Sequence, residues 1–153
     1  MQRTTVQRFG LRQSPGFVGE EVRYPDVVHD IAPPPDDLAD MLAGLQTFLD
    51  RARGQSPVMR STVAAFGFVY IHPLADGNGR VHRFLVDDVL RRDGVVQDPM
   101  ILPVSSLITS DAAERRAYDR ILDVVSRPLM HTLAGTYRFS ETATAYPDGI
   151  TST

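Results

Sequence analysis

The segment that decides the fold of this chain is residues 72–83, which read HPLADGNGRVHR. An almost uninterrupted apolar stretch, residues 63–71, comes directly before it, and such a stretch is typical of a helix in the middle of a bundle. Pro73 disfavours helical geometry in the residue before it, so the buried helix is predicted to end near His72. Two glycines then allow a tight turn, and a second helix is predicted from about Gly79.

Helical periodicity continues on both sides of this segment. A proline run ends at Pro35, and Asp36 is predicted to cap the amphipathic helix that follows. The apolar residues of that helix recur at spacings of three and four: Leu38, Met41, Leu42, Leu45, Phe48 and Leu49. The helix after the glycine turn has an apolar stripe of Val81, Phe84, Leu85, Val89 and Leu90. A last helix opens at Asp111 and is predicted to stop near Pro128. Its buried side is expected to consist of Tyr118, Ile121, Leu122 and Val125.

A short β-hairpin is predicted near the front of the chain. Residues 27–31 are β-prone, and their partner strand is expected near residues 17–22. The predicted fold is therefore mainly α, a single helical bundle of residues 10–135 with a small β-hairpin flap. Residues 1–9 and 136–153 are expected to be tails, and the second tail is interpreted as the start of a truncated segment in an excised fragment.

Composition excludes several classes of protein. The chain has 153 residues, enough for one domain, with 42% hydrophobic and 23% charged residues and a net charge of −3. An acidic balance argues against a nucleic-acid binder, and no basic recognition helix for DNA is found. The absence of cysteine excludes disulfides and thiolate chemistry. Since no apolar run is long enough to span a bilayer, no membrane partner is expected and the protein is interpreted as cytoplasmic.

His72 and Asp76 are candidates for acid–base and metal chemistry. A histidine at the end of a rigid helix, held by the following proline, suits a positioned base. The helix C-terminus is the negative end of the dipole, so the sequence predicts that it stabilises the imidazolium. Asp76 lies in the turn, where its carboxylate is a hard oxygen ligand suited to Mg²⁺ that also holds phosphate oxygens.

The rest of the segment predicts a polyphosphate site. Gly77 and Gly79 let consecutive amides point inward as an anion nest at a helix N-terminus, and Asn78 adds a side-chain donor. Arg80 and Arg83 lie three residues apart on one face of the helix, so both guanidinium groups can reach the same anion. Each feature alone is common in ordinary turns and helix faces. Their combination within one short segment is what predicts nucleotide chemistry.

These residues resemble the motif of the Fic family, which runs His, Pro, Phe, a variable position, an acidic residue, Gly, Asn, Gly, Arg, two variable positions and Arg. The segment departs from this pattern only at Leu74, which replaces the usual Phe as an apolar anchor. The resemblance extends from about Gly10 to Leu129. It implies a Fic-type helical bundle similar to those of bacterial members of the family. It also implies an enzyme that moves AMP from ATP to a Ser, Thr or Tyr hydroxyl of a target protein and releases pyrophosphate.

The resemblance also implies a role for each motif residue. His72 takes the proton of the target hydroxyl, and Asp76 holds Mg²⁺ (or Mn²⁺) against the α- and β-phosphates. Asn78 and the amides from Gly77 to Gly79 hold the α-phosphate. Arg80 binds the β- and γ-phosphates, and Arg83 reaches the γ-phosphate.

Two partners follow from the same resemblance. The family has a hairpin flap on which targets dock as an added strand; here it is expected at residues 19–32, with Val27, Val28, His29 and Ile31 as docking or packing residues. An ordinary packed hairpin is the alternative. Many members are held inactive by a glutamate that pairs with the second arginine, but no glutamate in this sequence fits that pattern. An inhibitory segment or partner is therefore expected outside this chain to supply a glutamate to Arg83, and a homo-oligomer is compatible with the sequence.

Other functions stay open at this stage. Removal of AMP from a target would use the same base and metal. Relatives that transfer phosphocholine or act as kinases tend to carry Ala or Lys at the position of Gly79, so Gly79 and Arg80 favour AMP transfer. A nucleotide-binding interaction module without turnover is the non-enzymatic alternative.

Overall fold

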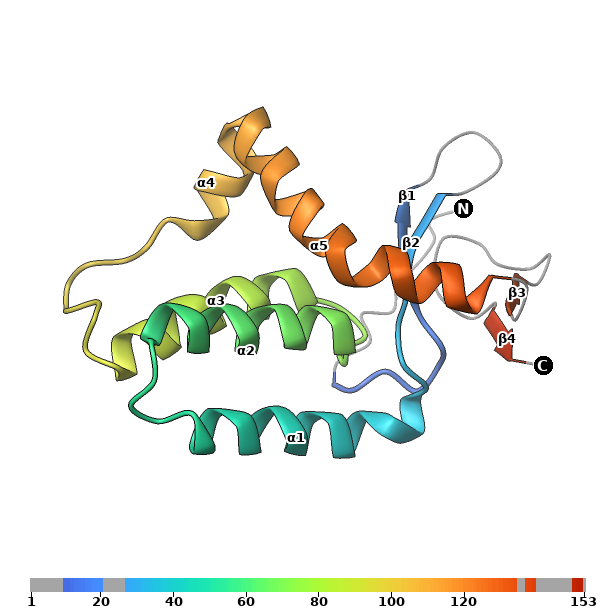
Figure 1. Cartoon of the computed structure of the whole chain (residues 1–153), viewed down its shortest axis with the longest axis horizontal. Helices are drawn as coiled ribbons and strands as arrows, with labels where there is room; N and C mark the ends of the chain where they lie inside the picture. The colour runs from blue at the N-terminus through green and yellow to red at the C-terminus, as the bar shows by residue number, and fades with distance from the viewer. Residues whose placement is uncertain (1–9, 21–26, 135–136, 140–149, 153) are drawn as a thin grey trace, which may run out of the picture.

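The computed structural model describes residues 10–20, 27–134, 137–139 and 150–152 of the chain (Figure 1). In chain order, its elements are β1 Phe17–Glu20, β2 Val27–Ile31, the 3-10 turn Pro35–Asp37, α1 Leu38–Arg51, α2 Pro57–Ile71, α3 Asn78–Arg92, α4 Val104–Ser110, α5 Ala112–Leu133, β3 Tyr137–Phe139 and β4 Ile150–Ser152. The mainly α fold with a small hairpin is confirmed. The tail predicted at residues 1–9 lies outside the described residues. No helix in the described part of the chain is both long and apolar enough to cross a membrane.

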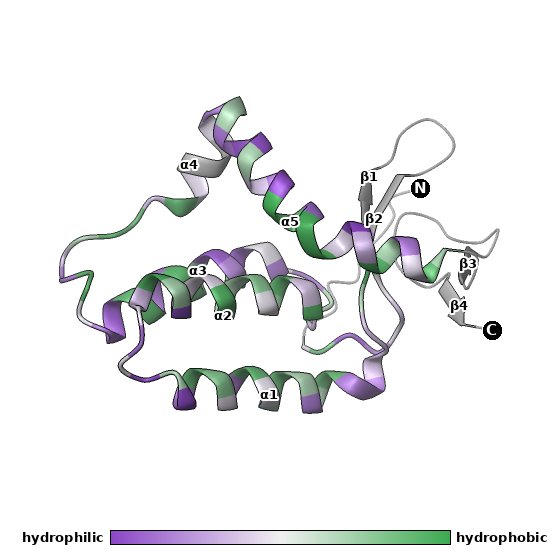
Figure 2. Ribbon diagram, viewed as in Figure 1, coloured by the Kyte–Doolittle hydropathy of each residue, from purple (hydrophilic) through white to green (hydrophobic). Residues whose placement is uncertain are grey.

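The helix α2 lies in the middle of the bundle, between α1 and α3 (Figure 1). Ser56 caps its start through a hydrogen bond from the Met59 amide, and Pro57 takes the first helical position, where its missing N–H costs nothing. Figure 2 shows that α2 is hydrophobic along much of its length, whereas α1 and α3 carry both hydrophobic and hydrophilic residues. The buried hydrophobic residues of these three helices are Leu38, Ala64, Ala65, Phe68, Ile71, Val89 and Leu90.

The last helix, α5, crosses over the bundle and reaches the hairpin (Figure 1). Tyr70 of α2 donates a hydrogen bond from its hydroxyl to the carbonyl of Leu122, at 2.8 Å. Tyr118 of α5 packs against Phe66 and the ring of His82, and its hydroxyl lies 3.3 Å from Nε2 of that histidine. These contacts from α2 and α3 fix α5 above the loop that joins those two helices.

The hairpin near the front of the chain is an antiparallel pair of β1 and β2. Phe17 faces Ile31 and Val18 faces Asp30, after which the register shifts, so that Gly19 faces Val28. The predicted hairpin is therefore confirmed, with strands inside the predicted residues. A second antiparallel pair, β3 and β4, lies within residues 136–153, which the sequence analysis treated as a tail.

Two predictions about the helices are wrong. Asp36 does not cap α1, because the proline run continues into a 3-10 turn and Asp37 takes the capping position without a side-chain hydrogen bond. Pro128 does not end α5, which continues to Leu133. A proline removes one hydrogen bond and crowds the preceding turn at a cost of about 3 kcal/mol, which a 22-residue helix can accommodate.

The predicted apolar faces of α3 and α5 are only partly buried. The buried residues of α3 are Asn78, His82, Val89 and Leu90, whereas Phe84 is 62% exposed. On α5, Ile121 and Val125 are also exposed, because the helix crosses the bundle obliquely and touches it along only part of its length.

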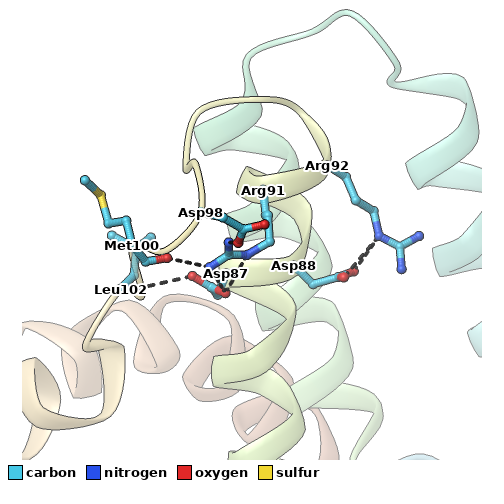
Figure 3. Close-up of polar contacts among 7 residues, drawn as sticks. All are labelled: Asp87, Asp88, Arg91, Arg92, Asp98, Met100 and Leu102. Atoms are coloured by element: carbon cyan, nitrogen blue, oxygen red, sulfur yellow. Dashed lines mark hydrogen bonds and ion pairs between the residues drawn. The ribbon is translucent and has the colours of Figure 1, made fainter.

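The loop from α3 to α4 is tied back to α3 by Arg91 (Figure 3). Its guanidinium pairs with Asp87 one turn earlier and with Asp98 in the loop, and it donates a hydrogen bond to the Met100 carbonyl. Asp87 also accepts a hydrogen bond from the Leu102 amide at 3.3 Å. The loop therefore returns along α3 to the start of α4.

Arg60 provides a test of what stabilises the bundle. Its side chain is 9% exposed, pairs with Asp93 at the end of α3 and donates to the Leu49 carbonyl at the end of α1. Arg60→Met leaves these partly buried acceptors without a donor. We therefore expect it to lower the free energy of unfolding by about 3 kcal/mol in urea denaturation. The control Arg53→Met, which breaks an exposed pair with Asp50, should leave it nearly unchanged. Equal losses in both variants would contradict this account.

Candidate active site

His72 stands at the C-terminal end of α2. Its amide donates to the Phe68 carbonyl at 3.0 Å, and its own backbone is left-handed, with φ 46° and ψ 52°. Left-handed geometry is uncommon for a residue other than glycine and needs support from its surroundings. Part of that support is Arg12, whose Nε donates to the His72 carbonyl at 2.8 Å.

The turn after His72 is held from two sides. On one side, Leu11 and Leu74 form an isolated antiparallel bridge, in which the Arg12 amide donates to the Pro73 carbonyl at 2.9 Å. On the other side, the side chain of Asn78 closes a ring with Leu74. Its Oδ1 accepts from the Leu74 amide and its Nδ2 donates to the Leu74 carbonyl, both at 2.8 Å. The turn therefore has fixed geometry.

This arrangement gives Asn78 a role that the sequence analysis did not predict. Asn78 is 4% exposed, and both ends of its side-chain amide are engaged with the backbone of Leu74. The side chain thus clamps the turn.

The anion site was predicted at the backbone amides that begin α3. Asn78 and Gly79 are the first two residues of the helix, where no earlier turn can accept their N–H groups. Gly77 precedes them with φ 90°, a left-handed conformation that favours glycine. A Cβ on Gly79 would lie 3.3 Å from a terminal nitrogen of Arg83, so glycine there also gives the arginine room.

The two arginines of α3 differ in their surroundings. Arg80 is exposed and forms an ion pair of 3.0 Å with Asp76, itself exposed. Such a pair contributes little to stability and opens readily. Arg83 is half-buried, and its Nε is buried with no hydrogen-bond partner in the part of the chain that the structure describes. A buried unpaired donor is costly unless a ligand supplies an acceptor, so Arg83 is prepared for an anion.

A cavity of about 330 Å³ brings the predicted residues together. Its lining consists of His72, Ala75, Asp76, Gly77, Asn78, Gly79, Arg80 and Arg83. The volume lies at the lower end of the range for small-molecule sites. Every motif residue singled out in the sequence for chemistry therefore faces one hollow, together with Ala75. The predicted docking residues Val27, Val28, His29 and Ile31 lie instead on β2, outside this lining.

Burial lowers the pKa of His72 below its ordinary value of 6.5, and the charge of Arg12 acts in the same direction, whereas the Val69 carbonyl raises it. The ring is therefore neutral near pH 7, as a proton acceptor must be. The sequence predicted that the helix dipole would stabilise the imidazolium, but burial and the charge of Arg12 outweigh that effect. Arg12 places a cation on the last carbonyls of α2 and offsets the negative end of that dipole.

The residues of the cavity fit a divalent metal only together with a substrate. Among the described residues, no group of three or more His, Cys, Asp or Glu side chains could hold a metal ion. Asp76 offers one exposed carboxylate at the cavity. Mg²⁺ is commonly held by one or two carboxylates plus substrate phosphates and waters, which is the donor set that Asp76 and a polyphosphate would form.

Comparison with known proteins agrees with this geometry. The model of the Fic/DOC family matches residues 1–90, more than half of the chain. This chain belongs to the Fic/DOC family.

Within the family, named adenylyltransferases match just under half of this chain. A protein adenylyltransferase Fic of Drosophila mojavensis is 37% identical over 75 residues, which are 48% of this chain and 14% of that protein. A protein adenylyltransferase of Caenorhabditis briggsae is 35% identical over 71 residues, 46% of this chain and 13% of that protein. A crystal structure of a Fic family protein from Desulfovibrio desulfuricans G20 has a TM-score of 0.60 and 32% identity, and the match covers 82% of this chain and 36% of that one. This Fic domain therefore spans only a minor part of the relatives' length.

Sequence reasoning missed two residues that support the site. Arg12 lies in a segment without periodicity and is far from the motif in sequence, so nothing marked it as buried. His82 occupies one of the two variable positions of the motif, to which the resemblance assigns no role. It is 2% exposed, and its Nδ1 lies 2.8 Å from the Ala65 carbonyl. The signal available in the sequence was its spacing of four residues from Asn78, which puts both residues on the same side of α3.

The clamp made by Asn78 can be tested with an isosteric change. Asn78→Asp keeps the acceptor for the Leu74 amide but sets a carboxylate oxygen against the Leu74 carbonyl. We expect the free energy of unfolding to fall by about 2 kcal/mol and Mg·ATP affinity to fall with it. Urea denaturation and calorimetry measure the two quantities. A variant as stable as the wild type would show that the clamp is unimportant.

Proposed function

We propose that this Fic domain is a protein adenylyltransferase, which moves AMP from ATP to a hydroxyl of a target protein. The observation that carries the proposal is the single cavity lined by a neutral histidine, a carboxylate, helix-start amides and two arginines. The relatives named protein adenylyltransferase support it, although they match less than half of this chain.

The proposed reaction is an in-line displacement at the α-phosphorus of ATP. Nε2 of neutral His72 accepts the proton of the target hydroxyl, since Nδ1 is buried. The hydroxyl oxygen forms a bond to the α-phosphorus, and the bond from that phosphorus to the bridging oxygen breaks, so pyrophosphate leaves with the electron pair. The target retains an AMP ester. The domain contributes positioning and charge stabilisation, as in other phosphate transfers.

The phosphates are assigned along the start of α3. The amides of Asn78 and Gly79 bind the α-phosphate, and the two guanidinium groups bind the phosphates that leave. Arg83 already lacks a partner for Nε. Arg80 forms an ion pair with Asp76, so binding of Mg·ATP would separate this pair. A bound Mg²⁺ or Mn²⁺ would supply charge neutralisation at the α- and β-phosphates, and Asp76 is the side chain that would hold it.

The hairpin formed by β1 and β2 is proposed as the docking flap. A target segment adding to the edge of β2 that lies away from β1 would use backbone hydrogen bonds along residues 27–31. We also propose that the target offers a Ser, Thr or Tyr hydroxyl. An inhibitory segment or partner that supplies a glutamate to Arg83 is part of the same proposal.

Intact-mass analysis tests the proposed reaction. Incubation of the domain with Mg·ATP and a candidate target, or with the domain alone as its own target, should add the mass of one AMP. His72→Ala should abolish this gain, because the proton acceptor is lost. His131→Ala removes an exposed histidine near the end of α5 and should leave the gain intact.

Two other outcomes point to different functions. Nucleotide binding that is equal in the wild type and His72→Ala, with no mass gain in either, would identify a binding module. Loss of AMP from a modified target, dependent on His72, would identify the reverse reaction.

The pH dependence of transfer follows from the lowered pKa of His72. A base with a pKa below 6.5 stays neutral down to mildly acidic pH, so the rate should be level near pH 7. It should fall on acidification with a midpoint below 6.5. Burial raises the pKa of Asp30 to about 6, so Asp30→Asn is the control that shows whether this carboxyl contributes. An acid limb that disappears in Asp30→Asn, or a midpoint above 6.5, would contradict the assignment of His72.

A further inference from the structure

Arg12 is a buried cation that has no carboxylate partner among the described residues. It is 5% exposed, and its guanidinium donates only to backbone carbonyls. Burial lowers its pKa, yet an arginine remains charged at any ordinary pH. A buried charge is costly unless its donors are satisfied, so the position of this side chain needs an explanation beyond packing.

The four carbonyls around Arg12 come from three separate parts of the chain. Nε donates to His72 at 2.8 Å, and one terminal nitrogen donates to Ile71 at 3.3 Å and to Pro33. The other terminal nitrogen donates to Ser14 at 3.1 Å. Ser14 lies just before β1 and Pro33 just after β2, so the guanidinium joins both ends of the hairpin to the end of α2.

This set of bonds acts on the backbone of His72. The last carbonyls of a helix have no partner within the helix, and a cation near them is favoured by the dipole. Here that cation binds the carbonyl of His72, whose left-handed φ of 46° needs outside support. The backbone amide of Arg12 also donates a hydrogen bond to the Pro73 carbonyl, so Arg12 binds the backbone of the residue that follows the base as well.

We propose that Arg12 is a positioning residue for the general base: it sets the direction of the His72 ring by binding its backbone, and it anchors both ends of the docking hairpin to that same point. This inference rests on the proposed function, since it requires His72 to be the base. Among the described residues that line the cavity, His72 is the one to which the hydrogen bonds of Arg12 lead, so we expect Arg12 to act through that residue. Its loss should therefore reduce turnover and leave nucleotide binding in place.

Arg60 is a matched control for Arg12. Both are buried arginines, 7% and 5% exposed, and both donate to carbonyls at the end of a helix. Arg60 lies at the start of α2, at the end of that helix opposite to His72. Substitutions at Arg60 should thus reproduce the loss of stability without disturbing the base.

The experiment compares Arg12→Gln, Arg12→Lys, Arg60→Lys and His72→Ala in the same chain. It measures the melting temperature, the affinity for Mg·ATP and the kcat of AMP transfer at saturating ATP and target. A misdirected base is expected to lower kcat by about 100-fold in Arg12→Gln. Arg12→Lys keeps the charge and should recover about 10-fold of that loss, while the affinity for Mg·ATP stays within about 3-fold of wild type. Arg60→Lys should retain the wild-type kcat at temperatures where it is folded.

The results separate the proposed adenylyltransferase function from the proposed positioning role of Arg12. Wild-type activity that survives in His72→Ala, or no transfer by the wild type at all, contradicts the proposed function. Activity that depends on His72 but is unchanged in folded Arg12→Lys and Arg12→Gln overturns the positioning role alone. Equal losses of kcat in Arg12→Lys and Arg60→Lys, or failure of both Arg12 variants to fold, would also overturn it, because Arg12 would then be purely structural.

Discussion

The tight turn between α2 and α3 is the constraint on which the rest of this structure depends. Two helices that pack side by side place the end of one and the start of the next within a few residues of each other. The buried side-chain amide of Asn78 closes that turn against Leu74 at 2.8 Å on both sides, and Leu11 pairs with Leu74 in an isolated antiparallel bridge. Because the turn is fixed, an imidazole at a helix end and amides at a helix start face the same space without any further element.

The electrostatics of the site follow from the same turn. The end of α2 would ordinarily present a negative dipole to His72, but the guanidinium of Arg12 lies on its last carbonyls. Burial and this charge together lower the pKa of His72, which leaves a neutral base. The start of α3 presents the opposite dipole end, with Arg83 unpaired at Nε and Arg80 held only by an exposed carboxylate. The negative end is offset and the positive end is left available, so the start of α3 is the side of this turn that favours an anion.

The sequence predicted the parts of this arrangement that local rules determine. A proline after His72, two glycines in the turn and two arginines at a spacing of three were enough to predict the helix end, the bend and the side chains that share the cavity. It could not predict contacts between distant segments. Arg12 reaches the end of α2 across 60 residues of sequence, and His82 is buried against Phe66 of α2 and Tyr118 of α5. Pro128 was misinterpreted for a similar reason: a local rule predicted a break, and a long helix continued through it.

The central claim is that one triphosphate is bound between the end of α2 and the start of α3. A crystal structure of this chain with Mg²⁺ and a non-hydrolysable ATP analogue tests it most directly. The account predicts the α-phosphate at the amides of Asn78 and Gly79, the γ-phosphate at the guanidinium of Arg83, and the Asp76–Arg80 pair opened. A nucleotide bound elsewhere on the domain, with that pair intact and Nε of Arg83 still without an acceptor, would contradict it.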